Sequence, residues 1–377
     1  MASRKVSLLG IPPEVRAIII DLVPHIPSPA PRHPTSLRDQ KRRVIERSES
    51  GAWSQESRVF FEQTPVPNPV LGLLLTNRQL HDETRAMLKR SFSFDTKPAR
   101  LPSYTLDVVY LKDCTLWSTW LSVPARAPHV DTVFTQFRLF NCPDGMRIAT
   151  DTKRDMFQIG CGGPPPIMWP LYHLLICAPK FGPCGCAFTM RRLVIDFLPA
   201  EEDDLLPLGL TTITRYDDNT PVDWFEVSLG GSWTPPSADR RLKGPALMME
   251  FVKAQIRRLM WMEHTEFELA KKMYESIGEI ELRLAGEVCT NLDLAESLAS
   301  LNGWGDPGSS RQRKWETQFV QWRPWVMARR RELGMPVQEV VPQVDQDIQV
   351  MTDGDGSDKS VEFDESDGSG QSDYCDP

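Results

Sequence analysis

The chain has 377 residues, and its 43 Lys and Arg side chains against 51 Asp and Glu give a formal net charge of −8. Hydrophobic residues make up 41% of the chain, enough for one large domain or two smaller ones, while 32 prolines indicate long loops. No apolar run reaches the ~18 residues of a membrane helix, the first residues lack a secretory signal pattern, and eight cysteines are too few for a disulfide scaffold. These features exclude membrane and secreted classes and predict residence in the cytoplasm, the nucleus or both.

The acidic charge is concentrated at the C-terminal end. From residue 339 onward twelve acidic residues stand against one lysine, so this segment carries −11 and residues 1–338 carry +3. Its Asp, Gly and Ser content offers little surface to bury, so we predict a disordered acidic tail at 336–377. A solubilising role is the simplest interpretation. An interaction or phosphorylation role around Thr352, Ser366 and Ser369 is the alternative.

The N-terminal quarter contains two predicted helices separated by an insertion. Pro12 and Pro13 open the first helix, and apolar residues follow at helical spacing to about residue 23. The insertion at 24–69 is rich in proline and basic residues, and we expect it to be exposed, with a short helix near 36–48. The second helix spans about 70–90. The insertion has only a modest basic excess without interleaved aromatic residues, which disfavours nucleic-acid binding and favours a solvated linker.

The body at 95–335 alternates between strand-like and helix-like segments. Strands are predicted at 104–111, 130–140, 191–198 and 277–284. Helices are predicted at 112–122, 167–178, 245–275 with a break near 262–265, 292–301, and 311–333 with an aromatic stripe. This alternation predicts an α/β (or α+β) fold in which the N-terminal helical segment packs on a mixed, partly parallel sheet with helices. The arrangement is irregular and leucine-rich-repeat-like at most, because no fixed period recurs.

The search for chemistry-bearing motifs finds one weak metal candidate. His173, Cys177, Cys184 and Cys186 lie within 14 residues and are soft ligands of the kind that zinc binds. The Cys-x-Cys pair is tight for one tetrahedral ion, and a buried helix face for His173 and Cys177 with loop thiols at Cys184 and Cys186 is the favoured explanation. The phosphate-loop, zinc-protease and hydrolase signatures are missing from the sequence. We therefore predict a non-enzymatic protein without catalytic residues or a cofactor.

Two segments together resemble the fungal F-box-like protein family. Residues 8–23 (LLGIPPEVRAIIIDLV) look like the opening of an F-box, where Leu-Pro-x-Glu starts a helix followed by apolar residues. Residues 73–94 (LLLTNRQLHDETRAMLKRSFSF) look like the second half found in the fungal proteins, in which a Thr-Asn-Arg-Gln-Leu block precedes Phe residues. The resemblance assigns 6–94 to an F-box-like segment that contains the insertion at 24–69.

The resemblance implies a partner and a set of contacts. In such proteins the helices dock on the Skp-type adaptor of a cullin ubiquitin ligase, and the body that follows holds an unknown protein substrate. The residues implied as contacts are Ile11, Pro12, Val15, Ile18, Ile19 and Leu22. As a substrate adaptor, the protein would expose these side chains. As a self-contained scaffold or effector without a ubiquitin link, it would bury them, and a zinc protein centred on 173–186 is the third possibility.

Overall fold

A computed structural model of the chain describes the residues on which the following account rests. These are 7–38, 42–44, 59–62, 70–91, 101–111, 115–140, 171, 174–175, 178–180, 182–183, 185–198, 212–214, 221–223, 244–262, 267–301 and 310–339. All of them belong to the first of two units, 1–340 and 341–377, into which the chain divides. No helix in this part of the chain combines the length and the apolar composition needed to cross a bilayer. The predicted disordered tail lies outside the described residues from residue 340 onward, so that prediction stays open.

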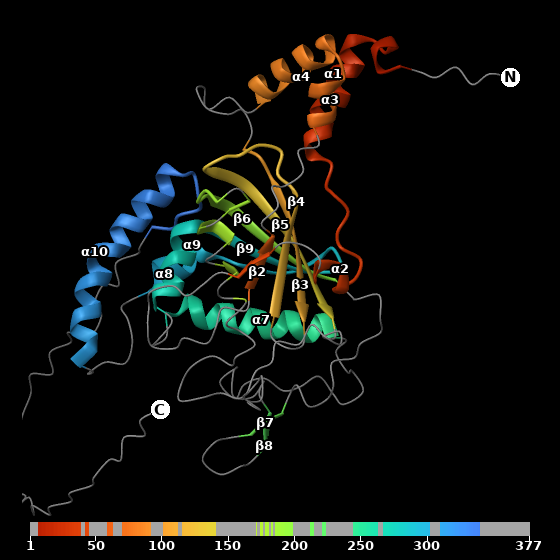
Figure 1. Cartoon of the computed structure of the whole chain (residues 1–377). Coiled ribbons are helices and arrows are strands. Elements are labelled where there is room, and N and C mark those ends of the chain that lie inside the picture. The colour runs from red at the N-terminus through yellow and green to blue at the C-terminus, as the bar shows by residue number, and fades with distance from the viewer. Residues whose placement is uncertain are drawn as a thin grey trace, which may run out of the picture. The chain divides into compact units, whose positions relative to one another are not determined.

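Eight strands form one mixed sheet in the order β1-β2-β4-β3-β5-β6-β9-β10 (Figure 1). Four central strands are mutually parallel and follow one another in chain order: β3 (Tyr104–Leu111), β5 (His129–Phe140), β6 (Thr189–Leu198) and β9 (Ile277–Leu284). The outer strands are of mixed direction. β4 (Thr115–Ser122) is antiparallel to β3, and β10 (Glu287–Leu292) is antiparallel to β9. Beyond β4, β2 (Val59–Glu62) is parallel to β4, and β1 (Arg42–Val44) is antiparallel to β2. The predicted α/β fold with a partly parallel sheet is confirmed. A separate two-stranded sheet joins β7 (Thr212–Thr214) and β8 (Pro221–Asp223).

Four helices pack into the main hydrophobic cluster with one face of the sheet: α7 (Gly244–Met260), α8 (Phe267–Ser276), α9 (Leu294–Ser300) and α10 (Ser310–Glu332). Alternate residues of β3, such as Leu106 and Val108, belong to this cluster, as do Val252 and Ile256 of α7. The break predicted near 262–265 is confirmed, since α7 ends at Met260 and Met262 adopts a positive φ of 54°. The predicted stripe of α10 is confirmed for Phe319, Trp322 and Val326, which are buried. The side chain of Trp315 is outside the described residues.

The other face of the sheet is partly covered by the segment that follows the first helix. Leu37 of α2 (Thr35–Arg38) is fully buried against Val109, Leu111 and Phe140. Arg138 donates to both carboxylate oxygens of Asp107, at 2.9 and 2.7 Å, and to the carbonyl oxygen of Pro31 at 2.7 Å. The expectation of an exposed insertion at 24–69 is therefore wrong for these residues and for β1 and β2, which join the sheet. The proline and basic content of the segment predicted a solvated loop and gave no sign that Leu37 would pack on the sheet.

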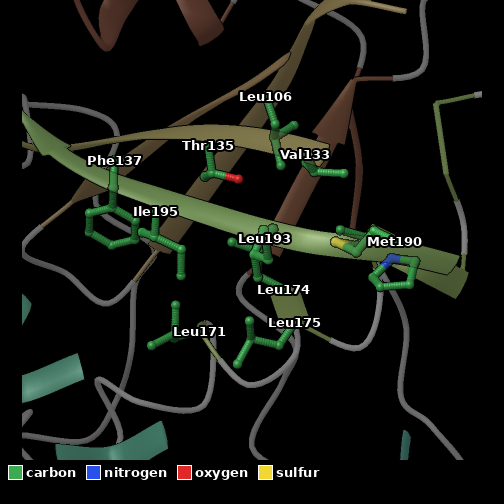
Figure 2. A pocket seen from close by; sticks show the side chains of 12 residues that line it. Leu106, Val133, Thr135, Phe137, Leu171, Leu174, Leu175, Met190, Leu193 and Ile195 are labelled. Carbon is green, nitrogen blue, oxygen red and sulfur yellow. The ribbon is translucent and has the colours of Figure 1, made fainter. Parts of the chain in front are cut away.

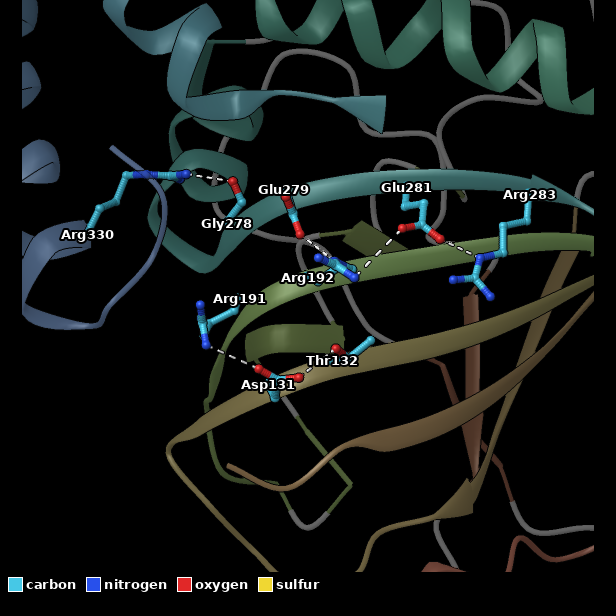
Figure 3. A network of polar contacts seen from close by, with 9 residues as sticks. All are labelled: Asp131, Thr132, Arg191, Arg192, Gly278, Glu279, Glu281, Arg283 and Arg330. Atoms are coloured by element: carbon cyan, nitrogen blue, oxygen red, sulfur yellow. Dashed lines mark hydrogen bonds and ion pairs between the residues drawn. The ribbon is translucent and has the colours of Figure 1, made fainter. Parts of the chain in front are cut away.

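Charged side chains connect the neighbouring strands β5, β6 and β9 (Figure 3). Arg192 of β6 contacts Glu279 and, at 3.9 Å, Glu281 of β9, and Arg283 also contacts Glu281. Arg191 reaches Asp131 of β5 at 3.4 Å. The pairs of Arg192 with Glu279 and of Arg191 with Asp131 join neighbouring parallel strands, and because they are largely exposed each contributes little to stability. Glu281 is buried, and it is paired with Arg192 and with Arg283 of its own strand.

The junction between α8 and β9 depends on one buried arginine. α8 ends at Ser276 and β9 begins at Ile277, so the last carbonyl groups of the helix lack partners of their own. Arg330 of α10 donates to the carbonyl oxygens of Tyr274 (2.8 Å), Ile277 (2.8 Å) and Gly278 (2.6 Å), the last of which Figure 3 shows. Burial lowers the pKa of Arg330 to about 10, so the guanidinium stays charged at neutral pH. Its charge lies near the C-terminus of α8, where the helix dipole favours a cation.

The helix predicted at 112–122 is wrong, because residues 115–122 form strand β4. The spacing of Leu116 and Trp120 suggested one face of a helix. Residues four apart also share a face of a strand, and both side chains indeed enter the main cluster. The Thr and Trp residues between them favour a strand, and pairing with β3 along its length outweighs the helical spacing.

A small cavity lies between the sheet and the side chains of Leu171, Leu174, Leu175, Ala178 and Pro179 (Figure 2). Its volume is about 20 Å³, room for one water molecule. Its walls are apolar apart from Thr135 of β5, which is buried and whose Oγ1 has no hydrogen-bond partner among the described residues. A water there would lack the two or more polar partners that hold buried water. The hydroxyl of Thr135 is therefore an uncompensated polar group in the core.

We expect Thr135→Val to raise the free energy of unfolding by about 1 kcal/mol, because it removes a buried hydroxyl that gains no bond on folding. Urea denaturation of the two proteins measures the difference. Thr119→Val is the matched control, since Thr119 Oγ1 accepts from Arg42 Nη2 at 2.8 Å, and this substitution should lower stability. A loss of stability in Thr135→Val would show that the hydroxyl has a partner.

Candidate functional site

The first helix of the candidate site, α1 (Pro13–Leu22), carries apolar side chains on its buried side and on its exposed side. Pro13 occupies its first turn together with Glu14, as the sequence predicts. Its buried side is made by Arg16 and Ile20, one turn apart. Val15, Ile18 and Leu22 lie on the exposed side. The helix therefore has apolar side chains on both sides, and burial within the chain accounts for only one of them.

The predicted helix at 70–90 is two helices, α3 (Leu71–Thr76) and α4 (Arg78–Ser91). Asn77 separates them in an extended conformation, and its Oδ1 accepts from the backbone N–H of Leu80 at 2.9 Å. This is an N-cap, and a side-chain amide acceptor is among the preferred caps. The sequence contained this signal, because an Asn before a second amphipathic stretch indicates a helix start.

The three helices pack around a cluster of their own. Ile20 of α1 meets Leu80 and Met87 of α4, which lie two turns apart. Leu8, Leu73 and Leu88 are packed against them. We call α1, α3 and α4, with the short 3-10 turn Leu8–Gly10, the helical module. Its cluster shares no residue with the two clusters at the sheet.

An ion pair between buried Arg16 and half-buried Glu83 connects the two halves of the helical module. Arg16 Nε donates to Glu83 Oε2 at 2.6 Å and Arg16 Nη2 donates to Oε1 at 2.8 Å. Arg16 Nη1 also donates to the carbonyl oxygens of Leu9 (3.2 Å) and Ile11 (3.0 Å). One side chain thus fixes α4 and the turn before α1. Periodicity could not find this pair, because the two residues are 67 positions apart and each looks like a solvated charge.

The bond from Arg16, followed by one from Gln79, lowers the pKa of Glu83 below its ordinary value of 4.5. A carboxyl whose pKa is lower in the folded protein adds stability above its unfolded pKa, and this stability is lost as pH falls through the folded pKa. We therefore expect the stability difference between wild type and Glu83→Gln to be largest above pH 4.5 and to shrink below it. Urea denaturation across pH 3–7 measures it, with exposed Asp82→Asn as the control. An unchanged difference at all pH values would contradict the ion pair.

The helical module exposes a group of large aliphatic side chains that we call the apolar face. Ile18 is 61% exposed and Leu75 is 75% exposed. The members are Leu9, Val15, Ile18, Leu22, Leu71 and Leu75. Single exposed apolar residues are common on protein surfaces, but Val15, Ile18 and Leu22 stand three and four residues apart on α1 and so share one side of that helix. Such a stripe indicates an interaction surface.

The six residues predicted as contacts separate into two groups. Val15, Ile18 and Leu22 belong to the apolar face, and Pro12 is exposed beside them. Ile11 and Ile19 are half-buried, so they divide their surface between the helical module and solvent. Ile20, which was not singled out, is the residue that α1 buries. In the run Ile18-Ile19-Ile20, the sequence alone could not say which side chain faces α4.

Most of the metal candidate lies outside the part of the chain that the structure describes. Of its four residues, Cys186 is described and is an exposed free thiol, whereas His173, Cys177 and Cys184 are not described. No group of three His, Cys, Asp or Glu side chains suited to a metal occurs among the described residues. The zinc hypothesis therefore remains a prediction.

The side chains of the apolar face can bind by removing aliphatic surface from water, and they carry no group for proton transfer or nucleophilic attack. They suit association with another protein. Comparisons with family models, with curated proteins and with solved structures found no match for the chain.

Proposed function

We propose that the protein is a non-enzymatic interaction protein whose helical module docks through its apolar face on a Skp-type adaptor of a cullin ubiquitin ligase. The sheet and its helices would hold a protein substrate, in the cytoplasm, the nucleus or both. The observation that supports this proposal is the exposure of Val15, Ile18 and Leu22 on a helix already fixed by Ile20 and Arg16. A self-contained scaffold would gain stability by burying these side chains, so their exposure favours the adaptor over the scaffold.

The packing of the helical module supports the same proposal. A docking helix must hold its orientation without its partner, because ordering it on binding would reduce affinity. The pair of Arg16 and Glu83 and the contacts of Ile20 hold α1 on α4 from the buried side. The exposed side is then available as a preformed surface.

We expect Ile18→Asp to weaken binding to the host's Skp-type adaptor by at least about tenfold, because it would bury a charge in an apolar interface. Pull-down and titration of purified proteins measure this loss. Val320→Asp is the matched control, since Val320 is 69% exposed on α10, outside the apolar face, and should bind as wild type does. Circular dichroism establishes that both variants are folded.

Either of two results would contradict the proposal. One is a folded wild-type protein that does not bind the adaptor. The other is Ile18→Asp binding as tightly as Val320→Asp. In both cases the scaffold or effector alternative would replace the adaptor.

A further inference from the structure

A second surface feature, unrelated to the helical module, is an open pocket at the amino ends of three parallel strands. Its volume is about 210 Å³. Tyr104 begins β3, and Phe188 immediately precedes β6. Pro128, just before β5, and Pro183 provide further apolar wall, and Arg126 and Cys186 also line the pocket. Tyr104 and Phe188 are buried, so the pocket meets only a small part of each ring, and the prolines, one cation and one thiol supply the rest of its lining.

The walls of this pocket are held in place by bonds within the chain. The Tyr104 hydroxyl donates to the carbonyl oxygen of Ala125 at 2.8 Å and accepts from the N–H of Ala127 at 3.0 Å, so it fixes the loop on both sides of Arg126. The ring of Phe188 lies 5.5 Å from that of Tyr104. On the opposite loop Gly182 has a φ of +45°, and a Cβ there would stand 2.3 Å from the carbonyl oxygen of Cys186. The pocket is thus preformed, which lowers the cost of filling it.

The charge at the pocket is positive. Arg126 is exposed and has no hydrogen-bond or ion-pair partner among the described residues. The nearby Asp131 is engaged by Arg191 at 3.4 Å. An anion would be favoured over a cation here.

We propose that this pocket binds a phenyl ring whose carboxylate is a few bonds away, with the ring between the aromatic and proline walls and the carboxylate at Arg126. A cavity of about 150 Å³ holds benzene, so the pocket has room for such a ring. The same chemistry occurs in free aryl acids and in the C-terminal phenylalanine of a peptide. The pocket contains no residue of the helical module. The proposed ligand can therefore be disproved without affecting the adaptor proposal, and the adaptor proposal can be disproved without affecting the ligand.

The thiol of Cys186 reports occupancy of the pocket. The full-length protein is treated with iodoacetamide, and alkylation of each cysteine is followed by peptide mass spectrometry. The probes are 3-phenylpropanoate and the peptide acetyl-Gly-Gly-Phe with a free carboxylate, with the same peptide amidated as the control. At ten times the Kd, a bound probe should slow alkylation of Cys186 about tenfold, because about a tenth of the pockets remain open. Cys289 of β10, also an exposed free thiol, should react at its unchanged rate.

Two variants test whether the protection of Cys186 from alkylation comes from a probe bound in the pocket. Arg126→Gln should raise the Kd of both carboxylate probes about fivefold, the change expected when an exposed charge pair is lost. Ala187→Phe, at an exposed residue that lines the pocket, should fill it and abolish protection. Protection by one carboxylate probe alone identifies the source, small acid or peptide end. No protection by either probe, equal protection of Cys289, or equal binding of the amidated peptide would overturn the proposal.

Discussion

Replacing Arg330 with methionine should lower the free energy of unfolding by about 3–5 kcal/mol, one of the largest losses that a single substitution in this chain can cause. The buried guanidinium donates to the carbonyl oxygens of Tyr274, Ile277 and Gly278, and to that of Pro336 at 3.1 Å. Methionine fills much of the space but donates nothing, so these buried acceptors would lose their partners. The junction of α8 with β9 would then open first.

The neighbouring Arg331→Met is the control for this substitution. Arg331 is exposed on the same helix and should change stability by less than about 0.5 kcal/mol. Urea denaturation followed by circular dichroism measures both variants. Equal effects of the two substitutions would mean that Arg330 contributes through helix propensity or net charge rather than through its bonds.

Gly278→Ala should destabilise the protein by about 3 kcal/mol. A Cβ at Gly278 would lie 2.2 Å from the carbonyl oxygen of Arg191 and 2.9 Å from its carbonyl carbon. Both are backbone atoms of β6, so no side chain can rotate away and the two parallel strands must separate. Gly278 also accepts from Arg330, so its substitution and that of Arg330 should be non-additive.

Gly72→Ala is the matched control, because it makes the same chemical change where nothing lies within 4 Å. Gly72 is in α3, and alanine there should raise stability by about 0.5–1 kcal/mol through helix propensity. Thermal and urea unfolding of the two variants should therefore shift in opposite directions. A neutral Gly278→Ala would show that β6 and β9 can move apart at no cost.

Strong alternation made part of the sheet predictable. The strand predicted at 104–111 matches β3 in full, because Tyr104, Leu106, Val108 and Tyr110 supply one buried face and the β-branched Val109 the other. The same reasoning failed at β4, where a spacing of four residues fits helix and strand equally. It missed β10, an edge strand whose side chains are mostly exposed, so its sequence carries little apolar pattern.

The sequence predicted where the candidate site lies, but not which of its apolar side chains are buried and which are exposed. The Pro-Pro-Glu start and the apolar run located α1, while three consecutive isoleucines gave no rule for assigning one to the core. That assignment depends on where α4 lies, and α4 is fixed by Arg16 and Glu83 across 67 residues of separation. The open pocket was not predicted either, because its lining comes from the start of β3 and from two loops brought beside it by strand order.

The order of segments along the chain limits how freely the helical module can turn. α1 belongs to the module. Ser28, Pro31 and Leu37 contact the sheet, and β1 and β2 join it. α3 and α4 belong to the module again, and β3 returns to the sheet. The polypeptide therefore passes between module and sheet three times. The helical module is therefore joined to the sheet by three stretches of chain. The second of them starts from β2, the strand that pairs with β4. Removing residues 1–94 would leave this edge of β4 unpaired, with Leu116 and Trp117 ready to pair with another chain.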